Sequence, residues 1–332
     1  MRNVALLSGS SHNFLSRGIA DYLGVELVSV KLGKFSNQES SVEINTSIRN
    51  KHVYIIQSSC GNVNDAYIEL LIMIQACRMG SASKISVVAP LFFYSRQHSV
   101  VQAIDSLSKD QLLKVDIDSK YKKWCPRIGT LICSLIESAG ADHLIVMDLH
   151  DPQYEGFFEI PVDVVYSEPC ILSYIKTNIP DWKNSVVVSP DAGVASVCNK
   201  LNLSFALIHN QRSGSISSMG LVGDVSGKSV ILIDDIIDSG KTVAAAVRIL
   251  QNHGVKDIHF IAIHGIFSGN CLDIINSLKI SSIACTNSVP QEDHLAKCPN
   301  LFVIDTSAII GETIRRSFHG ESVAHLFVSD KS

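Results

Sequence analysis

The chain has 332 residues, of which 46% are hydrophobic and 18% charged, and its formal net charge is −4 at pH 7. This length suits two ordinary domains or one large α/β unit, and the composition is that of a well-packed globular protein. The charge is spread along the sequence, so neither a nucleic-acid partner nor a membrane surface is expected. The sequence has no run of about eighteen apolar residues, so no membrane span is predicted.

The nine cysteines occur singly, with no Cys-x-x-Cys pair and no Cys/His cluster. Such spacing favours free thiols in a reducing compartment over a disulfide framework or a zinc site. The apolar run at residues 4–7 is too short for a signal peptide and predicts a first β-strand. We therefore expect a cytoplasmic protein.

Two segments, residues 53–91 and 230–264, resemble each other. Each begins with a wholly apolar strand, passes through a loop of small residues into a helix with apolar residues three and four apart, and ends in a second β-branched strand. This is the βαβ unit of a doubly wound parallel sheet. Because βαβ units are common, their likeness alone does not prove a repeat, but we favour shared ancestry of the two halves.

The fold predicted from this pattern is α/β, with two tandem doubly wound domains at residues 1–155 and 156–332. Gly80 and Gly254 are expected to end the two helices in the left-handed conformation. Residues 98–121 mix charge with short apolar pieces and predict a long surface loop inserted in the first domain. The expected strands are 85–89, 144–148, 186–189 and 258–263, and the expected helices are 70–78 and 243–251.

The most informative segment is ILIDDIIDSGKT at residues 231–242. A buried strand brings Asp234 and Asp235 to the carboxyl edge of the sheet, where open α/β folds bind ligands. The following loop opens a helix, whose backbone N–H groups and partial positive charge suit a phosphate. The paired acids can accept hydrogen bonds from a vicinal diol. Together they predict a ribose 5-phosphate site formed by Asp234, Asp235, Asp238, Ser239, Gly240, Lys241 and Thr242.

Two other interpretations of this segment are weaker. A Walker A loop needs a glycine five residues before Gly240, and Asp235 stands there instead. Simple capping of the helix would explain Asp238 but not two adjacent acids at the end of an apolar strand.

The segment resembles the PRPP-binding loop shared by phosphoribosyltransferases and PRPP synthetases. Further segments are similar to the synthetases alone and occur in the family's order along nearly the whole chain. The chain is thereby identified as resembling the ribose-phosphate pyrophosphokinase (PRPP synthetase) family, which implies two phosphoribosyltransferase-type domains. These segments are KFSNQES (34–40), YSRQ (94–97), MDLH (147–150), GFF (156–158), PVD (161–163), SPDAG (189–193), FALIH (205–209), HGIFSG (264–269) and GESVAHLF (320–327).

The resemblance implies roles for further residues, with ATP as co-substrate and Mg²⁺ as cofactor. It also implies a homo-oligomer built from dimers, or a mixed assembly with active paralogues. The ATP contacts would be Phe35, Asn37 and Glu39 from a neighbouring subunit, together with Arg96 and Gln97. The metal site would contain His150 and Asp191, with Asp148 and Asp163 nearby. The residues themselves support part of this site, because Asp148 and His150 alternate along one predicted strand.

In this family the C1 hydroxyl of ribose 5-phosphate attacks the β-phosphorus of Mg·ATP, which gives PRPP and AMP. A loop after the FALIH strand carries Lys-x-Arg, and here Arg212 matches the arginine while Asn210 replaces the lysine. Loss of one transition-state donor typically costs on the order of 10²–10³ in rate. The following stretch, SGSISSMG, is also shorter and less basic than the family's loop, and Lys241 stands where synthetases usually have glycine.

Two functions therefore remain open. The first is a ribose-phosphate diphosphokinase that supplies nucleotide biosynthesis. The second is a catalytically impaired, regulatory subunit that binds active paralogues. A phosphoribosyltransferase is less favoured, because it needs a base-binding hood and this sequence has synthetase segments in both halves.

Overall fold

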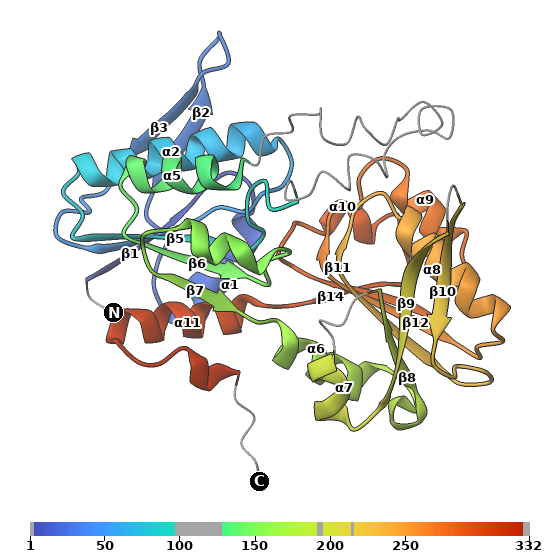
Figure 1. Ribbon diagram of the computed structural model, residues 1–332. Helices are drawn as coiled ribbons and strands as arrows, with labels where there is room; N and C mark the ends of the chain where they lie inside the picture. The colour runs from blue at the N-terminus through green and yellow to red at the C-terminus, as the bar shows by residue number, and fades with distance from the viewer. Residues whose placement is uncertain (1–2, 97–127, 191–194, 214–215, 328–332) are drawn as a thin grey trace.

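The computed structural model describes residues 3–96, 128–190, 195–213 and 216–327 (Figure 1). The predicted insertion at 98–121 lies outside these residues. Among the described helices, none is both long enough and apolar enough to cross a membrane. The eight described cysteines are free thiols, and seven of them are buried.

The first sheet has five parallel strands, and helices cover both of its faces (Figure 1). One face packs against α2 (Val63–Met79), α5 (Gly129–Ala139) and the hairpin of β2 (Val30–Lys34) and β3 (Ser40–Ile44). The other packs against α1 (Asn13–Leu23) and α11 (Ser307–His319). Burial on both faces explains why the strands are apolar without alternation. Their order is β1 (Val4–Ser8), β4 (His52–Ile56), β5 (Lys84–Ala89), β6 (His143–Met147) and β7 (Val162–Val165).

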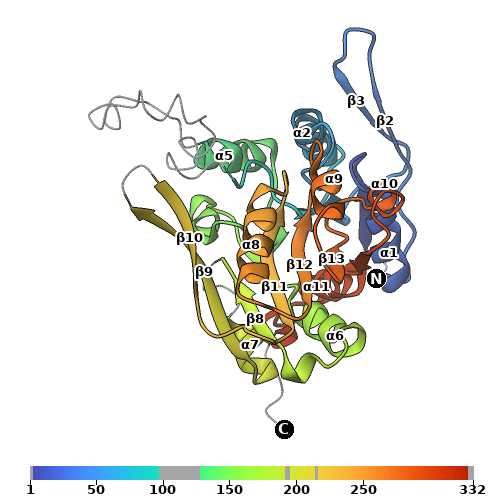
Figure 2. The same cartoon turned by 90° about the vertical axis from the view of Figure 1, so that its right-hand side faces the viewer.

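The second sheet has seven strands, all parallel to their neighbours except for the antiparallel pair at one edge (Figure 2). Helices α8 (Lys241–Asn252) and α9 (Cys271–Asn276) cover one face, and α6 (Glu168–Asn178) and α7 (Ala195–Leu201) the other. Its order is β10 (Ile216–Val222), β9 (Ser204–Ser213), β8 (Val186–Ser189), β11 (Val230–Ile237), β12 (Ile258–Gly265), β13 (Ser282–Thr286) and β14 (Leu301–Ile304). The short helices are η2 (Pro152–Phe157), η3 (Trp182–Asn184), α10 (Glu292–Leu295) and η5 (Ala324–Leu326).

The predicted α/β class with parallel, doubly wound sheets is confirmed. The strand predicted at 186–189 coincides with β8, and the predicted helices at 70–78 and 243–251 lie inside α2 and α8. The two sheets do not separate at residue 155, however. Strand β7 lies beyond that point and completes the first sheet, and α11 returns from the far end of the chain to cover it.

The two helix-ending glycines differ from each other. Gly254 is left-handed as predicted, with φ of 71°, but Gly80 has φ of −71° and the left-handed residue is Ser81. At Gly80 the packing explains the glycine, since a Cβ there would lie 3.1 Å from the side chain of Ile48. The prediction for Gly80 was therefore wrong about its backbone, and the close contact with Ile48 is a separate reason that favours glycine there.

Helix α11 is fixed to α1 by apolar and polar contacts. Ile310 and Ile314 are buried in the same core cluster as Leu15 and Ile19 of α1. At the edge of this contact, Glu312 accepts hydrogen bonds from the hydroxyl of Tyr22 at 3.2 Å and from the guanidinium groups of Arg315 and Arg316. These arginines hold the pKa of Glu312 down at about 2.

We predict that Glu312→Gln lowers the free energy of unfolding at pH 7 by on the order of 1 kcal/mol. The ionised carboxylate stabilises the fold above the ordinary glutamate pKa, and this contribution is lost as the pH falls toward 2. Urea unfolding at pH 7, 5 and 3.5 should therefore show a difference from wild type that shrinks at the lowest pH. The exposed Glu26→Gln is the control, and a pH-independent difference would contradict the prediction.

Candidate functional site

Strand β11 carries the paired acids past the end of its neighbour β8. The pairing between these strands stops where Leu232 lies opposite Val188, while β11 continues to Ile237. Asp234 and Asp235 therefore lie beyond the paired part of the two strands, beside a cavity of about 410 Å³. It is lined by Asp148, Leu149, His150, Pro152, Glu155, Val164, Tyr166, Ser189, Ile233, Asp234, Asp235 and Ile263.

The two acids are held by their own backbone and by the first half of the chain. One carboxylate oxygen of Asp234 accepts the N–H of Asp235 at 3.0 Å, and one of Asp235 accepts the N–H of Ile236 at 2.7 Å. The other oxygen of Asp235 pairs with Nδ1 of His150, which follows β6. This hydrogen bond raises the pKa of His150 and, against the opposing effect of burial, lowers the pKa of Asp235.

Asp148 does not continue the strand as predicted. Strand β6 ends at Met147, and Asp148 is left-handed with φ of 39°. The prediction that Asp148 and His150 alternate on one strand face is therefore wrong, although both line the cavity. The Asp148 carboxylate accepts the N–H of Ser167 at 2.7 Å, and burial raises its pKa to about 6. A cation beside this carboxylate would offset the cost of burying its charge.

The loop after β11 has the features expected of an anion-binding helix start. Gly240 is left-handed, with φ of 75°, and a Cβ there would lie 2.9 Å from Sγ of Cys271. Helix α8 begins at Lys241, and no side chain caps it. Its first N–H groups therefore depend on solvent or a ligand for partners. Asp238 does not cap this helix, although a capping role would have accounted for an acid at this position. It forms an ion pair with Arg96 of the first half instead.

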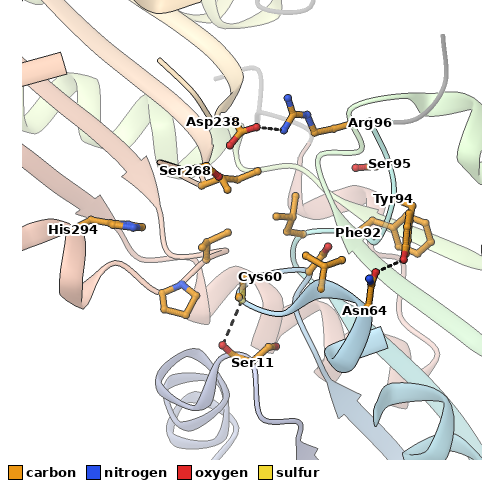
Figure 3. A pocket seen from close by; sticks show the side chains of 17 residues that line it. Ser11, Cys60, Asn64, Phe92, Tyr94, Ser95, Arg96, Asp238, Ser268 and His294 are labelled. Carbon is orange, nitrogen blue, oxygen red and sulfur yellow. Dashed lines mark hydrogen bonds and ion pairs between the residues drawn. The ribbon is translucent and has the colours of Figure 1, made fainter. Parts of the chain in front are cut away.

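A second cavity, of about 850 Å³, lies between the two halves, with the Arg96–Asp238 ion pair on one side of it and Cys60 and Ser11 on the other (Figure 3). The segment before Arg96 is held in an unusual conformation. Tyr94 has φ of 54°, its carbonyl accepts the hydroxyl of Tyr154 at 2.8 Å, and its own hydroxyl bonds to Asn64. These contacts fix the direction in which the chain enters Arg96.

Some residues implied by the resemblance lie away from these cavities. Asp163 accepts a hydrogen bond from Nε2 of His143 at 3.0 Å and does not line the cavity of the acid pair. Phe35, with 58% of its surface exposed, lies with Asn37 and Glu39 at the tip of the β2–β3 hairpin. That hairpin projects from the body of the molecule (Figures 1 and 2).

Gln97 and Asp191 lie outside the described residues. Asn210 and Arg212 belong to β9, with their backbones opposite Met219 and Ser217 of β10. The stretch expected to be a loop after residue 209 is therefore mostly a β-hairpin, because β9 continues to Ser213 and β10 begins at Ile216.

Sequence reasoning missed the hydrogen bonds that join the two halves behind the cavities. His12 bonds to the carbonyl of Asn287 at 2.7 Å, and the hydroxyl of Ser58 donates to the carbonyl of Ser288 at 2.6 Å. His264 bonds to the carbonyl of Asp148 at 3.1 Å. The HGIFSG segment marked His264 as part of the resemblance, but a lone histidine gives no local sign of a partner 116 residues away.

The donor set around the acid pair can be tested against Mg²⁺. Among the described residues, no group of three or more His, Cys, Asp or Glu side chains is arranged to hold a metal ion. Mg²⁺, however, usually takes only one or two carboxylates and completes its shell with water and substrate phosphates. Asp148, Asp234 and Asp235 offer such oxygens around one cavity, and the raised pKa of Asp148 marks a place where a cation would be stabilising. The residues therefore fit Mg²⁺ in donor chemistry.

The comparisons with known proteins agree with this architecture. Residues 4–114 match the family model of the N-terminal domain of ribose phosphate pyrophosphokinase, and residues 210–328 match that of the phosphoribosyl synthetase-associated domain. The crystal structure of phosphoribosylpyrophosphate synthetase from Mycobacterium smegmatis superposes with a TM-score of 0.83 at 32% identity, over 96% of this chain and 99% of that one.

Other similarities are partial. An adenine phosphoribosyltransferase shares 15% identity at a TM-score of 0.30, over 36% of this chain and 76% of its own. The orotate phosphoribosyltransferase from Aeropyrum pernix shares 14% at 0.31, over 47% and 78%. Such partial overlaps support no inference about this chain. The family models in both halves and the near-complete match at 32% identity, in contrast, do support an assignment to a family. On that evidence, the chain belongs to the ribose-phosphate pyrophosphokinase family.

Proposed function

We propose that this chain binds ribose 5-phosphate at residues 234–242 and transfers the pyrophosphoryl group of Mg·ATP to it, giving PRPP for nucleotide biosynthesis in the cytoplasm. The observation that carries the proposal is the acid pair beside a cavity, followed by an uncapped helix start. Both features belong to one strand and the loop that follows it.

In the proposed complex the sugar phosphate is held at both ends. The phosphate accepts hydrogen bonds from N–H groups at the start of α8 and from the side chains of Ser239 and Thr242. The ribose diol donates to Asp234 and Asp235. Each carboxylate already accepts a backbone N–H, but a carboxylate has about four acceptor positions, so both retain capacity for the diol.

The ATP site is proposed on the side of the cleft that carries Arg96. Arg96 now neutralises Asp238, and in the complex its guanidinium would also meet the ATP phosphates, with Gln97 beside it. Phe35, Asn37 and Glu39 would reach the adenine of a neighbouring subunit. All three are exposed on a projecting hairpin, where a neighbouring subunit has access to them.

Asp148 and His150, with Asp191, are the residues that would hold Mg²⁺, which supplies charge neutralisation for pyrophosphoryl transfer. In that role His150 would use Nε2 and keep the hydrogen bond from Nδ1 to Asp235, which is the usual arrangement of a metal-binding histidine. Asp163 is the weakest member of the implied set, since its carboxylate already bonds to His143.

The second candidate function is a regulatory subunit that binds the sugar phosphate without appreciable turnover and assembles with active paralogues. One observation favours it. Asn210 stands where the family has a lysine, so the transition state loses a positive charge that Arg212 alone must supply.

The ribose 5-phosphate site predicts that Asp234→Asn combined with Asp235→Asn abolishes binding of the sugar phosphate measured by calorimetry. Neutral amides are weaker acceptors for the diol and lose the pairing with His150. The matched control is Asp257→Asn, at the opposite edge of the same sheet, which should bind as wild type does. Unchanged affinity in a folded double variant would refute the assignment.

The transfer reaction is tested by following AMP release from Mg·ATP with ribose 5-phosphate and phosphate. Turnover of roughly 1–100 per second, ordinary for kinases, would establish the diphosphokinase and exclude the impaired subunit. If turnover is low, Asn210→Lys should raise it well above threefold while leaving ribose 5-phosphate affinity nearly unchanged, because the new charge acts on the transition state.

A charge-matched control separates this effect from a general change in electrostatics. Val222→Lys adds the same charge at the far end of the same hairpin, on an exposed residue opposite Leu207. It should leave turnover unchanged. A fully active wild type in which Asn210→Lys has no effect would show that Arg212 suffices.

The proposed contact between the β2–β3 hairpin and the ATP site of a neighbouring subunit predicts an oligomer built from dimers. Light scattering at micromolar concentration should give at least twice the 36.1 kDa mass of one chain. A strictly monomeric mass would contradict the proposal that Phe35 completes a neighbour's site. Co-purification with a tagged active paralogue would show whether mixed assemblies also form.

A further inference from the structure

One buried histidine outside the proposed binding residues connects the two halves at the cavity. His264, near the end of β12, is only 1% exposed. Its Nε2 lies 3.1 Å from the carbonyl oxygen of Asp148, and its Nδ1 lies 2.8 Å from the hydroxyl of Ser288. A carbonyl can only accept, so Nε2 carries the proton, and Nδ1 accepts from Ser288.

The orientation of this imidazole is set within the second half. The backbone N–H of Ser288 donates to Oγ1 of Thr286 at 3.2 Å, and that hydroxyl donates to the carbonyl of Ile263 at 2.6 Å. The carbonyl of Ser288 in turn accepts the hydroxyl of Ser58 from the first half. His264 therefore presents its Nε2–H in one fixed direction, across the boundary between the halves.

The group that receives this hydrogen bond is strained. Asp148 is left-handed, with φ of 39°, a conformation that few residues other than glycine adopt and that persists only where the surroundings determine it. Its N–H donates to the carbonyl of Val165 at 3.1 Å, and its carboxylate accepts the N–H of Ser167. Both of these partners belong to the first half. Only the bond at its carbonyl comes from the second.

The carbonyl is the group that decides where the chain goes next. The Asp148–Leu149 peptide sets the direction of the two residues that follow, and the second of them is His150, which pairs with Asp235. A rotation of this peptide would move His150 and turn the Asp148 carboxylate relative to the acid pair.

We propose that His264 is a positioning residue, which holds the Asp148 peptide from across the domain boundary so that Asp148 and His150 face Asp234 and Asp235. The role of this arrangement in cation binding rests on the proposed function. The hydrogen bonds of His264 themselves do not depend on that proposal. Cation binding at the cavity then depends on the docking of the two halves through this hydrogen bond.

The simpler alternative is a histidine that only fills the interface. The chain offers a matched control, because His259 is a second buried histidine on the same strand and bonds to Ser282, away from the cavity. A packing role predicts similar effects for both histidines. A positioning role predicts effects at residues 147–151 for His264 alone.

The experiment compares His264→Leu, His264→Gln, Ser288→Ala and His259→Leu with wild type. Calorimetry measures the affinities for Mn²⁺, used as the probe cation, and for ribose 5-phosphate, while hydrogen exchange follows residues 147–151. We expect His264→Leu to weaken Mn²⁺ binding about 10–100-fold, as is typical when a group that orients a metal ligand is lost. Exchange at 147–151 should accelerate, and ribose 5-phosphate affinity should stay within about threefold.

His264→Gln should remain close to wild type, because its amide N–H can replace Nε2–H, and Ser288→Ala should shift exchange in the same direction as His264→Leu but less. If His264→Leu does not fold, the positioning role is tested by comparing hydrogen exchange at residues 147–151 in His264→Gln and in Ser288→Ala. Wild-type exchange at 147–151 in His264→Leu, or equal changes in His259→Leu, would overturn the proposal. Failure of wild type to bind ribose 5-phosphate would refute the proposed function instead, and the exchange comparison would still decide the role of His264.

Discussion

The arrangement of the two halves depends on a row of buried hydrogen bonds to backbone carbonyls at their boundary. His12, Ser58 and His264 each bond to a carbonyl of the opposite half. A buried donor without an acceptor costs about 1–3 kcal/mol. A shift of one half past the other would break several of these hydrogen bonds at once and would add that cost for each. The boundary is thus specific in a way that an apolar interface of the same size would not be.

This docking brings strained strand ends together. Tyr94, Asp148 and Phe267 all have positive φ, and each follows the carboxyl end of a strand beside one of the cavities. Bulky or charged residues adopt this conformation rarely, and such residues gather at functional sites. These three positions come from both halves, which agrees with the proposal that the ligands bind in the cleft between them.

The sequence predicted the fold well because the βαβ pattern and the apolar strands are local signals. The acid pair and the helix start at Gly240 could also be predicted, since they lie within twelve residues of one segment. Other features depended on distant contacts. Neither the left-handed Asp148 nor the His143 partner of Asp163 has a signature in the neighbouring residues, and the β9–β10 hairpin overrode an expected loop. Propensity and spacing do not encode which side chains the fold brings together, even when they are only 20 residues apart.

The return of α11 to the first sheet has a consequence for synthesis on the ribosome. Ile310 and Ile314 complete a core that otherwise contains residues from the first half, including Leu15 and Ile19. That face of the first sheet is covered by α1 but lacks α11 while the whole second half is translated, which at about 5–20 residues per second lasts on the order of ten seconds or more. The nascent chain must therefore carry the part of this apolar surface that α11 later covers while residues 166–306 are made. A premature stop before residue 307 would leave the α11 side of this core exposed, so a small truncation would make the much larger remainder a substrate for chaperones.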